Sequence, residues 1–171
     1  MPASSKKTQS SLSRSRPERG QDAYRAEVQA RLGSSIKRAE QAMMVAKSKA
    51  LREYDLSVAQ YAAMLSLYYA PGQSAAQLAR AAAVTPQTMA TVLARLEAKK
   101  LITRVPSEIH SRVNVVTLTP AGEELGQKAD EKARAVEDLM SSEFTPQEQE
   151  QLRDLLGRLV EVLEGLSLIH I

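Results

Sequence analysis

The segment spanning residues 74–122 constrains the fold more than any other part of this chain. Ser74 can cap a short helix, and Gln77, three residues later, completes the spacing of a capping box. After a short turn, Thr85 is a second cap residue, and Pro86 stands at a first helical position, where its missing N–H costs nothing. The spacing therefore predicts two helices joined by a turn.

The second of these helices has two different faces. Its apolar residues follow a 3.6-residue repeat and are expected to face a core; they are Met89, Val92, Leu93 and Leu96. The opposite face carries Gln87, Thr88, Thr91 and Arg95. Short polar side chains followed by an arginine suit contacts with base edges and phosphates. Taken alone, these four residues are more typical of a helix face that is merely solvated.

The residues after this helix predict a β-hairpin. Ile102–Pro106 and Arg112–Leu118 have the residue pattern of two antiparallel strands around a polar loop. Thr119 and Pro120 then repeat the cap–proline pattern, so another helix should begin there. Two helices joined by a turn and followed by a hairpin are typical of a winged helix-turn-helix, which places one helix in the DNA major groove.

The charge of the chain is distributed unevenly. Residues 74–122 carry six Lys or Arg and two acidic residues, whereas residues 123–171 carry five and twelve. The net charge of +3 therefore combines a basic segment with an acidic C-terminal third. This distribution favours a protein that meets phosphates with one face only.

Three stretches resemble the multiple-antibiotic-resistance regulator (MarR) family of bacterial transcription factors. They are LSVAQYAAMLSL (56–67), SAAQLARAAAVTPQTMATVLARLEAKKLI (74–102) and SRVNVVTLTPAGEEL (111–125), and the resemblance extends over roughly residues 24–163. It implies a mainly α-helical protein with a small β-hairpin wing, in which a winged helix-turn-helix is combined with long dimerisation helices. The DNA-binding residues that we expect are Ser74, Thr85, Pro86, Gln87, Thr88, Thr91, Arg95, His110, Ser111 and Arg112.

The sequence departs from the family pattern at two positions. Lys100 stands where the family usually ends the recognition helix with glycine, which predicts a strained or differently terminated helix end. In the family wing an acid helps to orient an arginine that enters the minor groove. Here Arg112 keeps the arginine and His110 replaces the acid. A protonated His110 could contact phosphate, and an ordinary solvated loop residue is an equally good explanation.

The flanking segments predict long helices that would form a dimer. Residues 22–53 have one continuous helical stripe. A helix capped by Ser57 and Gln60 follows and runs to Pro71-Gly72, with Val58, Tyr61, Ala62, Leu65 and Tyr68 expected toward the core. Further helices are expected over residues 119–141 and from Thr145 to about residue 165. Their apolar area exceeds what a small winged domain can cover, which favours a two-fold homodimer on a palindromic operator.

These patterns divide the chain into five segments. We expect a disordered basic tail (1–20), an N-terminal dimerisation helix (21–55), the DNA-binding domain (56–122), C-terminal dimerisation helices (123–165) and a terminal hexapeptide (166–171). The hexapeptide LSLIHI matches the translation of a transposon-end adapter used in sequencing libraries, so it is suspected to be adapter-derived. An apolar tail that packs on a partner subunit is the alternative.

The composition excludes several other classes of protein. Cysteine is absent, which excludes disulfides and thiolate chemistry, and two unrelated histidines make a metal site improbable. There is no run of 18 apolar residues, so we expect a cytoplasmic protein without a membrane span. No nucleophile–base pair or glycine-rich phosphate loop indicates an enzyme, and no cofactor is expected.

Two functional hypotheses remain. The first is a homodimeric, sequence-specific DNA-binding regulator, most simply a repressor that a small molecule or a stress signal relieves. In the resembling family, small aromatic effectors bind between the dimerisation helices and the DNA-binding lobe. Met43, Tyr61, Met64, Tyr68 and Tyr69 could line such a cavity, or could be ordinary core and turn residues. The second hypothesis is a winged-helix module that binds a protein and has no operator.

Overall fold

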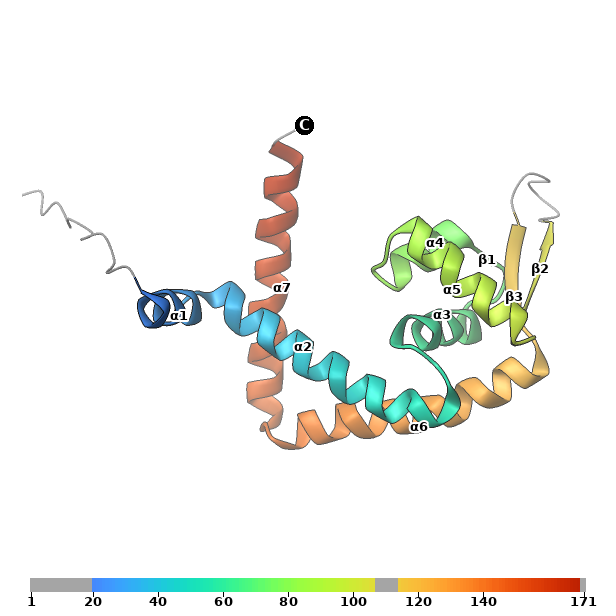
Figure 1. Ribbon diagram of the computed structural model, residues 1–171, viewed down its shortest axis with the longest axis horizontal. Coiled ribbons are helices and arrows are strands. Elements are labelled where there is room, and N and C mark those ends of the chain that lie inside the picture. The colour runs from blue at the N-terminus through green and yellow to red at the C-terminus, as the bar shows by residue number, and fades with distance from the viewer. Residues whose placement is uncertain (1–19, 107–113, 170–171) are drawn as a thin grey trace, which may run out of the picture. The chain divides into compact units, whose positions relative to one another are not determined.

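A computed structural model describes residues 20–106 and 114–169 of the chain, and side chains as far as residue 165 (Figure 1). The chain divides into two compact units, residues 1–41 and residues 42–171. The described part is mostly helical and carries one small antiparallel sheet. The predicted fold class, a winged helix-turn-helix with additional long helices, is confirmed.

The predicted single helix over residues 22–53 is wrong. Two helices stand there, α1 (Gln21–Gln29) and α2 (Leu32–Leu51), and α2 ends in a short 3-10 turn, η1 (Arg52–Tyr54). Between α1 and α2, the N–H of Arg31 bonds to the carbonyl of Val28, a tighter pattern than that of an α-helix. Gly33, a poor helix former, immediately follows the start of α2 and favours an interruption at this point.

Helix α3 (Val58–Tyr69) begins as the sequence predicts. The Ser57 hydroxyl accepts a hydrogen bond from the N–H of Gln60, and the side chain of Gln60 accepts one from the N–H of Ser57. The predicted core face of α3 is partly wrong. Tyr61 is buried, but Tyr68 is 47% exposed, and the fully buried positions are Ala63, Met64 and Leu67. The helix is covered on a broader side than one stripe because α4, α5 and α6 all contact it.

Helices α4 (Ala75–Ala81) and α5 (Pro86–Ala98) form the predicted helix-turn-helix. Strands β2 (Ile102–Pro106) and β3 (Asn114–Leu118) pair antiparallel, with Ile102 opposite Leu118. The sequence did not indicate a third strand, β1 (Gln73–Ser74), which pairs with the other edge of β3. The N-terminal residues of the predicted second strand, 112 and 113, lie outside the described residues.

One hydrophobic core joins these elements. Its largest fully buried side chains come from the end of α2, from α3, α4 and α5, and from β3. They are Leu51, Met64, Leu67, Leu78, Met89, Leu93, Leu96 and Val116. Helix α6 (Pro120–Ser142) adds Ala129 and Ala133, whose small side chains let it approach α3 closely.

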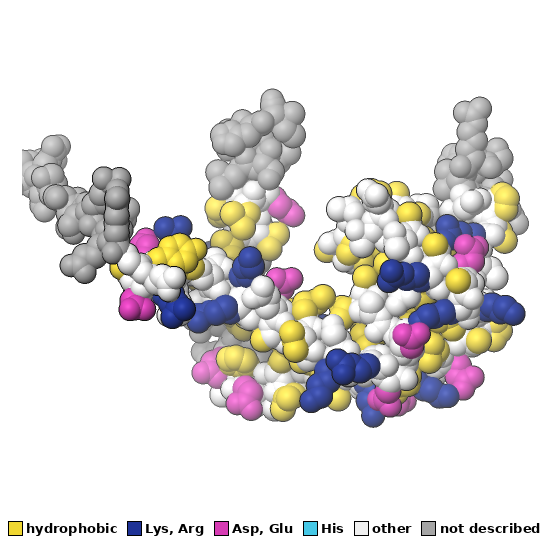
Figure 2. Space-filling model, viewed as in Figure 1, with side chains coloured by type: hydrophobic (Ala, Val, Ile, Leu, Met, Phe, Trp, Pro, Cys, Tyr) yellow, Lys and Arg dark blue, Asp and Glu magenta, His cyan; other side chains and the backbone are white. Residues whose placement is uncertain are grey.

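Helix α7 (Pro146–Ile169) begins at the predicted capping box, in which Thr145 and Glu148 bond to each other. It continues past the predicted end near Gly165. As far as residue 165, where side chains are described, α7 contributes nothing to the core. Leu159 is half-buried, and six other large apolar residues are exposed, as the hydrophobic side chains along α7 in Figure 2 show; they are Leu152, Leu155, Leu156, Val160, Val162 and Leu163.

Candidate functional site

The sequence of α5 produces a helix with one buried and one exposed face. Thr85 caps it, with its hydroxyl oxygen accepting from the N–H of Thr88 at 3.1 Å, and Pro86 fills the first turn. The four predicted core residues are buried, with Met89, Leu93 and Leu96 at 0% and Val92 at 6% exposure. This burial fixes the orientation of the helix, so the opposite face is held outward.

The outward face of α5 consists of the four polar residues that the sequence singled out, Gln87, Thr88, Thr91 and Arg95, and all four are exposed. Thr91 donates its hydroxyl proton to the carbonyl of Gln87 at 3.2 Å, which leaves its methyl group and oxygen accessible. Within the described chain, the side chains of Gln87 and Arg95 have no hydrogen-bond partner. Such uncommitted groups on a rigid helix are available to a ligand.

Two other predicted site residues have structural roles. The Ser74 hydroxyl accepts a hydrogen bond from the N–H of Gln77, and the side-chain oxygen of Gln77 accepts one from the N–H of Ser74, which closes the capping box of α4. Thr85 is similarly used as the cap of α5. Pro86 is exposed on the first turn. A contact of these residues with DNA remains a prediction.

The wing is described only at its base. There, the hydroxyls of Thr103 and Thr117 face each other across β2 and β3 at 2.9 Å, and Nε of Arg104 lies 3.1 Å from an oxygen of Glu97 on α5. The first contact joins the two strands of the hairpin, and the second attaches the hairpin to α5. The predicted tip residues His110, Ser111 and Arg112 lie outside the described residues, so their roles remain predictions.

The strained end of α5 that was predicted at Lys100 is confirmed. Its φ of 57° lies in the left-handed region, where glycine is favoured. The N–H of Lys100 bonds to the carbonyl of Glu97, and that of Leu101 to Leu96, which is the Schellman arrangement. Helix α5 therefore ends with the geometry that glycine usually provides. Because Lys100 has a Cβ atom, its left-handed conformation is strained.

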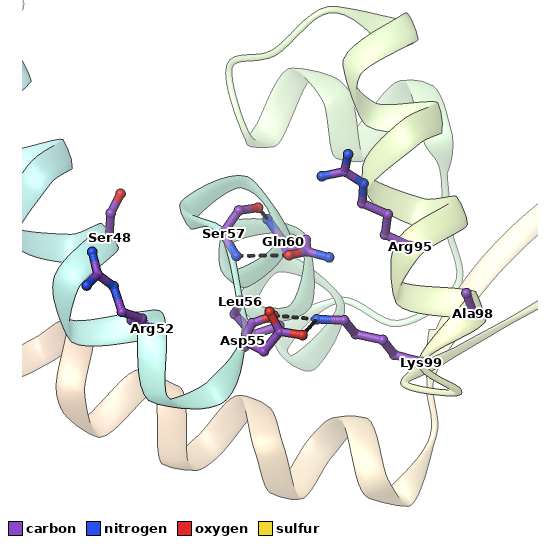
Figure 3. A pocket seen from close by; sticks show the side chains of 9 residues that line it. All are labelled: Ser48, Arg52, Asp55, Leu56, Ser57, Gln60, Arg95, Ala98 and Lys99. Carbon is purple, nitrogen blue, oxygen red and sulfur yellow. Dashed lines mark hydrogen bonds and ion pairs between the residues drawn. The ribbon is translucent and has the colours of Figure 1, made fainter.

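A groove of about 660 Å³ runs beside α5 and was not foreseen from the sequence (Figure 3). It is lined by residues of α2, η1, the start of α3 and the end of α5: Ser48, Arg52, Asp55, Leu56, Ser57, Gln60, Arg95, Ala98 and Lys99. The Lys99 ammonium is 2.7 Å from Oδ2 of Asp55, and this ion pair lowers the pKa of the carboxyl. Figure 2 shows several Lys and Arg side chains on the visible face of the part of the molecule that contains α3, α4, α5 and the sheet.

A second cavity, of about 330 Å³, lies between α3 and α6. Met64, Tyr68 and Tyr69 line it, as the sequence suggested for an effector cavity. Tyr61 is buried beside it in the core, and Met43 is not among the residues that line it. The rings of Tyr68 and Tyr69 pack edge to face, with 5.3 Å between their centroids.

A hydrogen-bonded network joins the two helices at this cavity. Tyr61 donates to Oδ1 of Asp130 at 2.6 Å, and Arg134 donates to Oδ2 at 2.5 Å and to the Tyr69 hydroxyl at 3.3 Å. Burial, followed by the bond to Asp130, raises the pKa of Tyr61 well above its ordinary value. Burial opposes ionisation of Asp130, but the bonds from Tyr61 and Arg134 outweigh it and lower the pKa of Asp130.

Two further classes of site are not found among the described residues. No group of three or more His, Asp or Glu side chains in that part of the chain could hold a metal ion. No helix there is long and apolar enough to cross a bilayer.

Comparison with known proteins agrees with this geometry. Residues 54–112 match the MarR family. The HTH-type transcriptional repressor Rv2887 of Mycobacterium tuberculosis is 34% identical over 112 residues, which are 66% of this chain and 81% of that protein. The crystal structure of Rv2887 with p-aminosalicylic acid has a TM-score of 0.61 at 32% identity and covers 76% of this chain and 98% of its own. The repressor CouR bound to a 23-mer DNA duplex shares the fold, with a TM-score of 0.72 at 21% identity, and covers 78% of this chain and 95% of its own.

Proposed function

Because this chain belongs to the MarR family of transcription regulators, we propose that it is a homodimeric repressor that binds a palindromic operator in the cytoplasm. The exposed polar face of α5 carries this proposal, since Gln87, Thr91 and Arg95 are uncovered while the opposite face is fully buried. Each copy would place α5 in a major groove, and the two grooves would lie about 34 Å apart on one side of the duplex.

The proposed dimer is supported by the apolar surface that the single chain leaves uncovered. Six large aliphatic side chains of α7 are at least 42% exposed, and Leu139, Met140 and Phe144 before them are at least 40% exposed. Large apolar side chains exposed in such number along one segment mark a protein interface. A second copy presents the same surface, so a two-fold arrangement can cover both at once.

Selection of bound genomic fragments by the purified protein tests the proposed operator. We expect an enriched motif with two-fold symmetry, whose half-sites are separated by about one helical turn, roughly 10 base pairs. A matched selection with Gln87→Ala should return a motif relaxed at particular positions. If the protein enriches no motif but retains a protein partner, the alternative of an interaction module is correct.

Relief by a small aromatic ligand is the second part of the proposal. The cavity between α3 and α6 supports it, because Tyr68 and Tyr69 offer aromatic surfaces and Arg134 offers a cation, although Asp130 and Glu131 line it too. The relative Rv2887 has been crystallised with p-aminosalicylic acid, so this compound is a suitable probe. We expect it to release bound DNA, and Arg134→Gln to raise the concentration that is required. Lys128→Gln on the same helix, away from the cavity lining, is the matched control. Equal sensitivity of the two variants would exclude this cavity.

A further inference from the structure

The groove beside α5 presents an uncommitted hydrogen-bond donor, the side-chain amide nitrogen of Gln60. Gln60 is only 5% exposed, and its side-chain oxygen is used to accept from the N–H of Ser57 at 2.9 Å. Within the described chain, its amide nitrogen has no partner. Figure 3 shows this nitrogen on the side of the groove that faces Arg95. A ligand in the groove can therefore accept a hydrogen bond from this nitrogen without breaking a contact within the described chain.

The charges around this donor indicate an anion. Arg52 of η1 and Arg95 of α5 line the groove from its two sides, and the Arg95 side chain extends toward the space between them (Figure 3). Neither has an ion-pair partner among the described residues. Lys99 and Asp55 also line the groove and are paired with each other, so the lining carries two uncompensated positive charges. The amide and the positive end of α3 face the same space.

The groove is continuous with the surface that reads DNA. Ser57, Gln60 and Arg95 line both this groove and a smaller one that Thr88 and Thr91 of α5 border. In the opposite direction, Ser48 and Arg52 also line a surface hollow with Lys49. A strand of the duplex that passes the exposed face of α5 would therefore meet a basic path that leads from α5 to the end of α2.

From these observations we propose that the groove binds a phosphate of the DNA backbone, contacted by Arg52 and Arg95 from its two walls and by the amide of Gln60 from its floor. The proposal rests on the function proposed above and extends the DNA contacts beyond the helix-turn-helix and the wing to η1 and the start of α3. Such a contact positions the recognition helix and carries no sequence information itself.

Binding to a mixed-sequence duplex of about 30 base pairs, about three helical turns, tests this contact at salt concentrations from about 50 to 200 mM. Arg52→Gln removes one wall charge. We expect about tenfold weaker binding, as for loss of a charged hydrogen bond, and a salt slope lower by about 0.9. Arg153→Gln on α7 removes the same charge from an exposed residue that lines none of these grooves, and we expect it to change neither quantity.

Gln60→Glu is a second variant that preserves the fold. Glutamate closes a capping box as glutamine does, so α3 should still begin at Ser57, while the donor becomes a carboxylate that repels phosphate. We expect weaker binding to every duplex, and a thermal unfolding midpoint close to that of the unaltered protein.

The outcomes separate this proposal from the one on which it rests. If the unaltered protein binds no duplex, the proposed function itself fails. If it binds, and Arg52→Gln matches Arg153→Gln in affinity and salt slope, the backbone contact is refuted. If inorganic phosphate raises the unfolding midpoint of the unaltered protein but not of Arg52→Gln, and DNA binding is equal, the groove holds a free anion and the assignment to DNA is overturned.

Discussion

Gly122 should be the least replaceable glycine in the chain. It lies in the first turn of α6, and a Cβ atom there would stand 2.0 Å from the carbonyl oxygen of Leu101 and 2.9 Å from its carbon. Nonbonded carbon atoms normally approach to about 3.5 Å. The carbonyl cannot turn away without loss, because it accepts the N–H of Thr119 at 3.0 Å. Gly122→Ala must therefore separate the end of α5 from the start of α6.

The expected cost follows from two opposing terms. Overpacking costs about 1–3 kcal/mol, and the upper end applies here because the obstructing atoms are backbone. Alanine returns up to about 1 kcal/mol through its helix propensity, so the net loss should be about 2 kcal/mol. At Gly126, one turn later in α6, the nearest atom to an added Cβ is the Met64 methyl carbon at 3.6 Å, an ordinary contact. Gly126→Ala should therefore stabilise by up to about 1 kcal/mol.

Thermal unfolding of the two variants at equal protein concentration measures this difference. For a domain of this size, 1 kcal/mol corresponds to about 2–4 °C, so a gap of about 3 kcal/mol predicts midpoints about 6–12 °C apart. The protein concentration has to be fixed because any dimerisation shifts the midpoint. If the two alanine variants unfold at the same temperature, the close approach of α6 to Leu101 is wrong.

Four other changes have defined outcomes. Lys100→Gly should raise the free energy of unfolding by about 0.5–1 kcal/mol in urea titrations, because glycine adopts the left-handed φ without strain; no gain would contradict that conformation. Tyr61→Phe should lower it by about 1 kcal/mol through loss of the bond to Asp130. The pKa of Tyr61 is raised in the folded state, so Tyr61 contributes fully to the free energy of unfolding below its ordinary pKa of 10.0 and contributes less as the pH rises above that value. Tyr61→Phe should remove this loss of stability at alkaline pH. Thr91→Ala should flatten base preference at one operator position by about 1–3 kcal/mol, measured by competition between operator variants, and equal preference would displace Thr91 from the base contacts. Leu156→Lys should shift the mass in light scattering toward that of a monomer, whereas Glu161→Lys, also exposed on α7, should leave it unchanged.

The helix-turn-helix could be predicted from the sequence because its determinants are local. A cap residue, a following proline and a 3.6-residue apolar repeat fix where α5 begins and which face it buries, and all four predicted core residues are buried. The polar face is then determined by exclusion. The same local rules placed the starts of α3, α4, α6 and α7 at their cap residues.

The features that escaped prediction depend on contacts between distant residues or on unusual conformations. Three helix ends have a non-glycine residue in the left-handed region, Asp55, Ala83 and Lys100, and only Lys100 was suspected, because the family usually has glycine there. Strand β1 is two residues long and exists through its pairing with β3. The groove at Arg52 and Gln60 forms where η1, α3 and α5 meet. A repeat of apolar residues along one helix does not predict where separate elements come together.

The junction at Leu101 connects the cavity between α3 and α6 with the recognition helix. The carbonyls of Lys100 and Leu101, directly after α5, accept hydrogen bonds from the hydroxyl and the N–H of Thr119, the cap of α6. Gly122 fills the remaining space, so the end of α5 and the start of α6 must move as one body. Since Asp130 and Arg134 of the cavity lie further along α6, a ligand that displaces α6 there would also displace the end of α5. An effector would thereby change the placement of α5, the helix that we propose to read DNA, without touching its exposed face.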